Sequence, residues 1–152
     1  MDNISDNAPH ERPLIGEILM KRKRITKEQL DHALEMQRQE NGFIGEILVK
    51  SGYVEERDIV VALVVQCGLP YIAVAKYAID PAIVKLIPEE TARRARVIAL
   101  DWIGDILSVV MVNPLGLEEK ARLEAMTGCR IATFITTKSE MEEAIARNYA
   151  DL

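Results

Sequence analysis

LIGEILMKRKRITKEQLDHALEMQ, residues 14–37, recurs as FIGEILVKSGYVEERDIVVALVVQ, residues 43–66. The two stretches align without a gap at an offset of 29 residues, and nine of the 24 aligned pairs are identical. Internal self-similarity of this kind is typical of a duplicated structural unit. Because one unit of this size cannot bury its own apolar face, the repeat predicts two copies that pack against each other.

Each copy favours a short helix followed by a longer one. The expected helices are 13–21, 27–39, 44–50 and 57–66. Thr26 and Gln29 have the spacing of a capping box at the start of the second helix, and Ser51-Gly52 favours the end of the third. The sequence from 13 to 67 therefore predicts an all-helical tandem-repeat subdomain of two helical hairpins, joined by residues 38–42.

The composition changes after the repeat, and the second half mixes helix and strand signals. Helices are expected at 81–86, 88–94 and 117–126 and after Thr137, and strands at 96–100, 105–112 and 130–135. Asp80-Pro81 has the pattern of a helix start, and a turn is expected at 102–104 between the first two strands. Residues 69–75 have an extended pattern. We therefore expect residues 68–152 to form an α+β subdomain with a roughly three-stranded sheet, and the fold class to be α+β.

Charge and hydropathy limit the classes of partner. The chain has 152 residues and a net charge of −5, so it has no overall attraction for a nucleic acid polymer or an anionic membrane. The apolar run 59–65 is shorter than the roughly 20 residues that cross a bilayer, so no direct membrane insertion is expected. The basic run Lys21-Arg22-Lys23-Arg24 has two interpretations, a solvated turn between helices or a phosphate-binding patch.

No residue pattern indicates catalysis. The glycines nowhere form a phosphate-binding loop that ends in Lys-Ser or Lys-Thr, and His10 and His32 are not paired with a plausible nucleophile. Cys67 and Cys129 do not have the spacing of metal ligands. Residues 1–12 are polar, are expected to form a flexible tail, and do not resemble a signal peptide. The sequence therefore predicts a cytoplasmic protein that is not an enzyme and that has no metal and no cofactor.

A family resemblance rests on the repeat and on three later segments, GLPYI, IDPAIVKLIPEETARRARVIAL and RIATFITTKSEMEEAI. Together they resemble the N-terminal domain of the type II secretion and type IV pilus assembly ATPases, over nearly the whole chain after residue 12. In that family the domain couples the motor to the inner-membrane platform through a cytoplasmic partner, and some members bind cyclic di-GMP. The resemblance implies a regulatory and docking module without its motor, with cyclic di-GMP as a candidate ligand.

The members that bind cyclic di-GMP carry a tandem pattern, RLGxxLxxxGxxxxxxLxxxLxxQ, whose length and spacer match the two copies in this chain. Carried over position by position, the resemblance implies a set of candidate ligand-binding residues that is shared between the copies. These are Ile15, Gly16, Leu19, Leu30, Leu34, Gln37, Ile44, Gly45, Leu48, Gly52, Leu63 and Gln66.

Three departures from the pattern bear on the ligand. Its leading arginine is Leu14 in the first copy and Phe43 in the second, and its middle glycine is Lys23 in the first. An arginine that stacks on a base or binds a phosphate contributes about 1–3 kcal/mol. Two hypotheses follow. One is a non-enzymatic docking domain that acts on a protein partner. The other is a cyclic di-GMP receptor in which Phe43 stacks on a base and Lys21, Lys23 or Arg24 supplies charge from the adjoining turn.

The sequence leaves the partner surface open. The helix expected at 57–66 is apolar nearly all round, so it must bury more than one side. Its valines at 60, 61, 64 and 65 either face a partner or pack against the second subdomain. The repeat also has two interpretations, a ligand surface or a duplicated packing unit in which Gly16 and Gly45 allow helices to approach closely.

Overall fold

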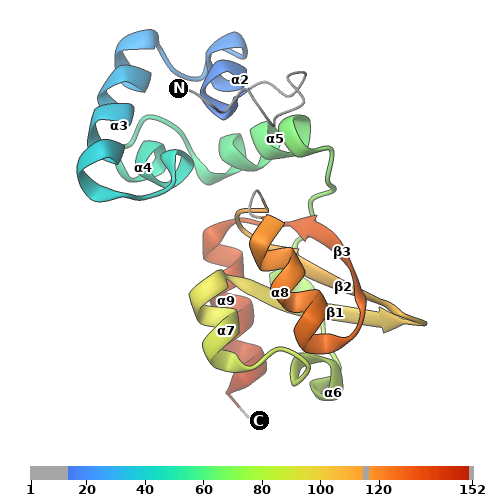
Figure 1. The fold of residues 1–152 in the computed structure, drawn as a ribbon. Helices are drawn as coiled ribbons and strands as arrows, with labels where there is room; N and C mark the ends of the chain where they lie inside the picture. The colour runs from blue at the N-terminus through green and yellow to red at the C-terminus, as the bar shows by residue number, and fades with distance from the viewer. Residues whose placement is uncertain (1–13, 115–116, 151–152) are drawn as a thin grey trace. The chain divides into compact units, whose positions relative to one another are not determined.

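The computed structural model describes residues 14–114 and 117–150, which belong to two compact units (Figure 1). The first unit ends at Gly68, and its described residues form helices and turns. The second begins at Leu69 and combines helices with a three-stranded sheet. The expected α+β fold class is confirmed.

Four helices form the described part of the first unit, α2 (Ile15–Lys21), α3 (Lys27–Glu40), α4 (Ile44–Lys50) and α5 (Glu56–Cys67). The two predicted helical hairpins are therefore confirmed, although the start expected at residue 13 lies outside the described residues. The predicted capping box is also present. Thr26 Oγ1 accepts a hydrogen bond of 3.1 Å from the Gln29 N–H, and Gln29 Oε1 accepts one of 3.0 Å from the Thr26 N–H. Asn41, with φ of 59°, ends α3 in the left-handed conformation.

Each short helix packs against the long helix of the other copy, since α2 contacts α5 and α4 contacts α3. Leu19 and Leu48 occupy equivalent positions in the two copies, and neither is exposed to solvent. Ala33 and Ala62 are likewise fully buried, and their small side chains allow the helices to come close. The copies thus bury apolar stripes that a single hairpin would leave in water.

The second unit contains η1 (Val74–Lys76), α6 (Pro81–Val84), α7 (Glu89–Ala95), β1 (Val97–Ile103), β2 (Ile106–Met111), α8 (Leu117–Thr127), β3 (Arg130–Ile135) and α9 (Lys138–Tyr149). The sheet order is β1-β2-β3. Strands β1 and β2 form an antiparallel hairpin, and β3 runs parallel to β2 after the chain crosses through α8. The expected three-stranded sheet is confirmed.

The turn that the sequence predicts at 102–104 is wrong. Strand β1 continues through Ile103, which pairs with Ile106, so the hairpin turns at Gly104 and Asp105. Gly104 has φ of 63°, and a two-residue hairpin turn needs this left-handed conformation. The strand reaches further than expected because the glycine, and not the apolar pair before it, decides where the chain reverses.

Two smaller boundaries also differ from the prediction. Helix α6 ends at Val84 and not at residue 86. Within the segment expected to be extended, Tyr71 forms an isolated parallel bridge to Ile135 before the short helix η1 begins. The sequence Asn113-Pro114-Leu115-Gly116 also predicts the end of the hairpin after the second strand, and residues 115–116 lie outside the described residues.

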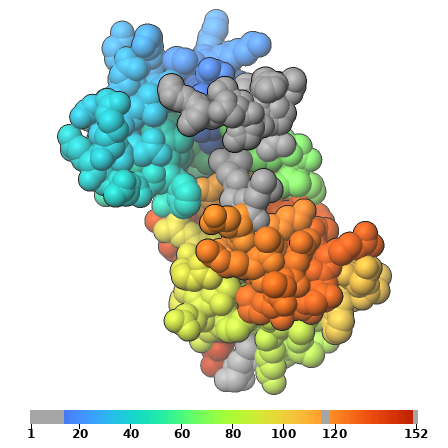
Figure 2. Space-filling view, viewed as in Figure 1, coloured from blue at the N-terminus to red at the C-terminus, as the bar shows by residue number. Residues whose placement is uncertain are grey.

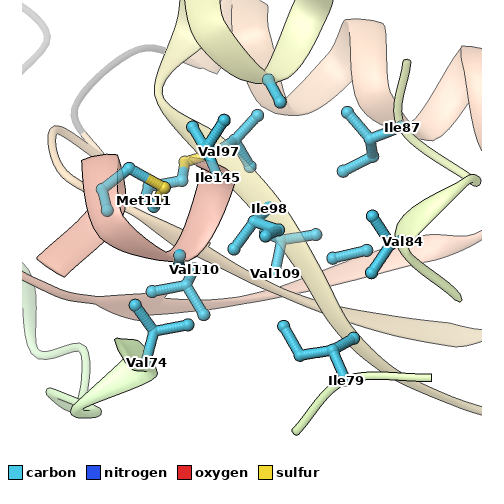
Figure 3. Close-up of a cluster of buried hydrophobic side chains, with 14 of the residues drawn as sticks. Val74, Ile79, Val84, Ile87, Val97, Ile98, Val109, Val110, Met111 and Ile145 are labelled. Carbon is cyan, nitrogen blue, oxygen red and sulfur yellow. The ribbon is translucent and has the colours of Figure 1, made fainter. Parts of the chain in front are cut away.

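The core of the second unit lies between the sheet and the helices that cover it (Figure 3). Its fully buried side chains include Val74, Val84, Ile87, Val97, Ile98 and Val109. Near the end of α9, Tyr149 is only 6% exposed, and its Oη donates a 2.6 Å hydrogen bond to the Ile87 carbonyl oxygen. This bond ties the last helix to the residues that follow α6, and burial raises the pKa of Tyr149 to about 12.

The segment that enters the second unit is tied to β3 and α9. The Ile72 N–H donates to the Ile135 carbonyl oxygen at 2.9 Å, and Tyr71 Oη donates to Glu140 Oε2 at 2.6 Å. Arg147 donates to two backbone carbonyl oxygens of the segment, including that of Tyr77 at 2.9 Å. The hydrogen bond to the Glu140 carboxylate, with a smaller contribution from burial, raises the pKa of Tyr71 to about 12.

We expect Tyr149→Phe to lower the free energy of unfolding by about 1–2 kcal/mol, because the Ile87 carbonyl loses its donor in a buried setting. Urea unfolding followed by circular dichroism measures the change. Tyr77→Phe is the matched control, since Tyr77 is 45% exposed and its hydroxyl has no hydrogen-bond partner in the described part of the chain. Equal effects of the two substitutions would contradict the role given to the buried bond.

The raised tyrosine pKa values predict a loss of stability in alkali. A tyrosine with a pKa near 10 when unfolded and about 12 when folded contributes stability that is complete below pH 10 and is lost as the pH rises towards 12. We therefore expect the free energy of unfolding of the unmodified protein to fall more steeply above about pH 10 than that of Tyr149→Phe. Urea unfolding at about pH 9 and about pH 11 tests this. Parallel curves for the two proteins would contradict it.

Candidate functional site

The two motif glycines lie at close contacts between helices. A Cβ atom on Gly16 would come within 2.9 Å of Leu30 Cδ1, and one on Gly45 would come within 3.1 Å of Ile59 Cγ2. Leu30 and Ile59 are equivalent positions of the repeat. In each copy, therefore, the glycine lets the short helix approach its own long helix, which is a packing role.

Most of the aliphatic candidates lie in the interior. The buried ones are Ile15, Leu19, Leu48 and Leu63, and Leu30 and Ile44 are half-buried. Leu34 differs, because it is 38% exposed although its equivalent in the second copy, Leu63, is only 5% exposed. Hydrophobic burial is sufficient to explain the buried members of the motif.

The motif glutamines sit near the ends of the long helices. Gln37 Nε2 donates a 2.9 Å hydrogen bond to the carbonyl oxygen of Gly42, in the loop that leads to α4. This bond satisfies a loop carbonyl and joins the first copy to the start of the second. Gln66, the equivalent residue, is half-buried near the end of α5.

Gly52 has a backbone role. It follows α4 with φ of 80°, and no atom lies within 4 Å of the place where a Cβ would stand. Glycine adopts this left-handed conformation without strain and commonly ends a helix. Its equivalent in the first copy is Lys23, whose φ of 61° is also left-handed.

Leu14 and Phe43 reach solvent, in contrast to most of the motif. Each is the N-cap residue of a short helix, of α2 and α4 respectively, and each has an extended backbone conformation. Leu14 is 52% exposed and Phe43 is 54% exposed. The two positions that carry arginine in the family pattern therefore present large apolar side chains to the surface.

Two contacts between the copies were not predicted from the sequence. His32 Nδ1 and Tyr53 Oη share a 2.5 Å hydrogen bond, and their rings meet edge to face. Arg24 Nε lies 3.3 Å from Asp58 Oδ1. Residues 24 and 53 are equivalent in the repeat, so each copy uses the same turn position to reach the long helix of the other. The equivalence of the two positions could have predicted these contacts from the sequence. The residues at the two positions, Arg24 and Tyr53, differ in type, so the alignment does not make the shared role evident.

The valines proposed as a partner surface divide between interior and surface. Val60 is buried and Val64 is half-buried, whereas Val61 is 37% exposed and Val65 is 53% exposed. Helix α5 therefore buries one side. Of the four valines considered as a partner surface, only Val61 and Val65 are exposed, so the apolar surface is narrower than the sequence alone indicates.

Several charged groups of the structure form ion pairs. Hydrogen bonding and charge from Arg38 lower the pKa of Glu35, and those from Arg130 lower the pKa of Asp105. Within residues 14–114 and 117–150, no group of three or more His, Cys, Asp or Glu side chains is placed to hold a metal ion. None of the helices in this part of the chain is long and apolar enough to cross a bilayer.

Known proteins resemble the chain over most of its length. The model of the MshEN domain family matches residues 67–152. The type IV pilus assembly ATPase PilB of Myxococcus xanthus is 34% identical over 137 residues, which are 90% of this chain, and PilB of Thermus thermophilus is 31% identical over 140 residues, or 91%. The chain spans 24% and 16% of the lengths of these two relatives.

Solved structures share the fold. A structure described as MshE with cdg has a TM-score of 0.78 and 26% identity, and the match covers 91% of this chain and all of that one. The N-terminal domain of XpsE has a TM-score of 0.75 at 21% identity, over 91% of this chain and 94% of that one. These matches confirm the resemblance to the N-terminal domains of secretion and pilus ATPases. Because the family model covers more than half of its residues, the chain belongs to the MshEN domain family.

Proposed function

We propose that the chain is a non-enzymatic docking module of the secretion and pilus ATPase type, which couples to a cytoplasmic or platform protein partner. One observation carries the proposal, the replacement of both motif arginines by half-exposed apolar residues, Leu14 and Phe43. An apolar side chain gains free energy when a partner protein removes it from water, at about 25 cal/mol per Å². Neither side chain supplies the cation that a phosphate needs.

The remaining motif residues support a packing origin for the pattern. Gly16 and Gly45 serve helix contacts, Leu19 and Leu48 are fully buried, and Gln37 binds a backbone carbonyl. These roles persist whether or not a nucleotide binds. Packing alone therefore explains the presence of the pattern, and the docking proposal needs no ligand for it. We also propose that the protein is cytoplasmic and that the chain divides into a tail (1–12), the repeat (13–67) and the α+β part (68–152).

We expect the double variant Leu14→Ser/Phe43→Ser to weaken partner binding by about tenfold or more, because truncating buried interface anchors typically costs above 1 kcal/mol each. Surface plasmon resonance measures this, with the full chain immobilised. The analytes are the cytoplasmic regions of pilus or secretion platform proteins from the same genome.

The matched control for docking is Ile103→Ser/Trp102→Ser. These residues are 71% and 50% exposed, so the control removes comparable apolar surface from the β1–β2 hairpin of the second unit. An equal loss in variant and control would contradict the assignment of docking to Leu14 and Phe43. Absence of saturable binding to every platform protein would contradict docking itself.

A second candidate function is a cyclic di-GMP receptor. MshE, whose structure is described with cdg, is similar to this chain over 91% of its residues. The candidate ligand residues would be those of the repeat, in two equivalent halves, with exposed Leu34 and Phe43 as apolar contacts for a base. The proposed absence of a cofactor does not conflict with this, because cyclic di-GMP would act as a signal ligand.

Calorimetric titration with cyclic di-GMP separates the two functions. For a docking module we expect no saturable heat at millimolar ligand, and we expect Leu14→Arg/Phe43→Arg to gain binding because it restores the cations of the family pattern. ATP and GTP are the ligand controls. Saturable binding by the unmodified chain at about micromolar ligand, lost in Gln37→Ala/Gln66→Ala with an unchanged melting temperature, would instead support the receptor.

A further inference from the structure

Four consecutive cations, Lys21, Arg22, Lys23 and Arg24, lie where α2 ends, Lys21 as its last residue and the other three in the connection to α3. We call these four residues the basic turn. All four residues are exposed, and the blue segment that contains them lies at the surface in Figure 2. The turn is a concentrated positive charge in a chain whose net charge is −5.

The second copy provides an internal reference for the basic turn, because its turn 50–53 has the same backbone. In the first copy the Lys23 N–H donates to the Met20 carbonyl at 2.9 Å and the Arg24 N–H to the Leu19 carbonyl at 2.8 Å. The equivalent bonds from Gly52 and Tyr53 are both 3.0 Å. Yet the second turn reads Lys-Ser-Gly-Tyr and carries one cation in place of four. The backbone therefore does not require the charge.

Lys23 occupies a position that suits glycine. Its φ of 61° is left-handed, like the 80° of Gly52. A residue with a Cβ pays about 1 kcal/mol or more in this conformation, and only glycine avoids the cost. Asn41, which is also left-handed, has a side chain that tolerates the region, and a lysine has no such advantage. Arg96, with φ of 55°, is another basic residue in this conformation, so the strain at Lys23 supports a role for its side chain only together with the exposed cations beside it.

Of the four cations in the basic turn, Arg24 forms an ion pair with a carboxylate of the described chain. Arg24 Nε lies 3.3 Å from Asp58 Oδ1, whose side chain is only 15% exposed. Asp58 is held in place because its other oxygen, Oδ2, accepts a 2.9 Å hydrogen bond from the Glu55 N–H. Within the described part of the chain, the side chains of Lys21, Arg22 and Lys23 form no ion pair or hydrogen bond. By contrast Lys50, the equivalent of Lys21, lies 3.8 Å from Glu40.

We propose that the basic turn binds an acidic segment of a partner protein. Lys21, Arg22 and Lys23 would pair with carboxylates of the partner, as Arg24 pairs with Asp58 within the chain. Carboxylates fit both the planar guanidinium and the lysine ammonium groups. A membrane fits less well. Each cation near an anionic bilayer contributes only about 1 kcal/mol, and recognition of that kind uses clusters of four to eight cations. The pairing of Arg24 with Asp58 leaves three cations of the turn for a partner, and the net charge of −5 opposes approach to the bilayer.

This inference rests on the proposed docking function in one respect, that the partner is a protein. It adds that the partner offers acidic side chains to the basic turn. Leu14 lies at the start of α2 and the basic turn at its end, so the two sets of residues can be substituted independently. A test with a peptide probe therefore gives a result that is independent of Leu14, of Phe43 and of any platform protein.

The test variant is Arg22→Ser/Lys23→Gly, which gives the first turn the residues that the second copy holds on the same backbone. Removing the strain at Lys23 should keep or raise the melting temperature. The control is Lys85→Ser/Lys120→Ser, which removes two exposed lysines of the second unit and changes the net charge equally. Lys21→Gln/Arg22→Gln is a further variant that leaves Lys23 in place, should the first fail to fold.

The probe is a fluorescein-labelled glutamate-rich peptide, and fluorescence anisotropy at low and at physiological salt measures its binding to the full chain. We expect saturable binding to the unmodified chain that weakens as salt is raised. We expect Arg22→Ser/Lys23→Gly to lower the affinity at least about threefold more than the control does, as is usual for the loss of exposed ion pairs. A smaller difference, or no saturable binding, would overturn the proposal. So would binding of phosphatidylglycerol vesicles that depends on the turn when the peptide does not bind.

Discussion

The exchange of helices between the two copies is the constraint on which the first unit depends. Each short helix packs on the long helix of the other copy, and it approaches its own long helix at a glycine. At Gly16 a Cβ would stand 2.9 Å from Leu30 Cδ1, closer than carbon atoms approach without displacement. Because both helices of a copy are engaged in this way, the ends of the short helices are fixed. The N-cap residues Leu14 and Phe43 and the basic turn stay exposed at these ends.

The two copies share the same backbone structure in their turns but differ in the side chains at the surface and at the contacts between the copies. The turns 21–24 and 50–53 repeat the same hydrogen bonds, but one reaches the other copy through an ion pair of Arg24 and the other through the Tyr53–His32 bond. Leu34 is 38% exposed, whereas Leu63 at the equivalent position is buried. A ligand that treated both copies alike would need matching surfaces, and these differences reduce the match.

Local signals in the sequence predict most of the fold. Thr26 with Gln29 and Asp80 with Pro81 mark helix starts because the atoms that cap a helix are close in sequence, and the repeat predicts the hairpins because their apolar spacing occurs twice. The sequence pattern places the end of β1 too early, since it predicts a turn from Trp102, whereas the strand continues to Ile103 and the chain turns at Gly104. Contacts such as Arg24 with Asp58 join residues far apart in the chain, and no local pattern encodes them.

The candidate site shows why a retained motif and a retained ligand are different inferences. In the repeat, the residues that match the family pattern are largely those with a packing role, and packing maintains them under any function. The informative positions are the ones that packing leaves free, residues 14, 43 and 21–24. There the chain has apolar side chains in place of arginine, and it carries four cations where the second copy carries one. The apolar side chains remove cations that the phosphates of a nucleotide would need, and four cations in one copy against one in the other reduce the symmetry between the copies. Both features are compatible with the protein-docking function that we propose.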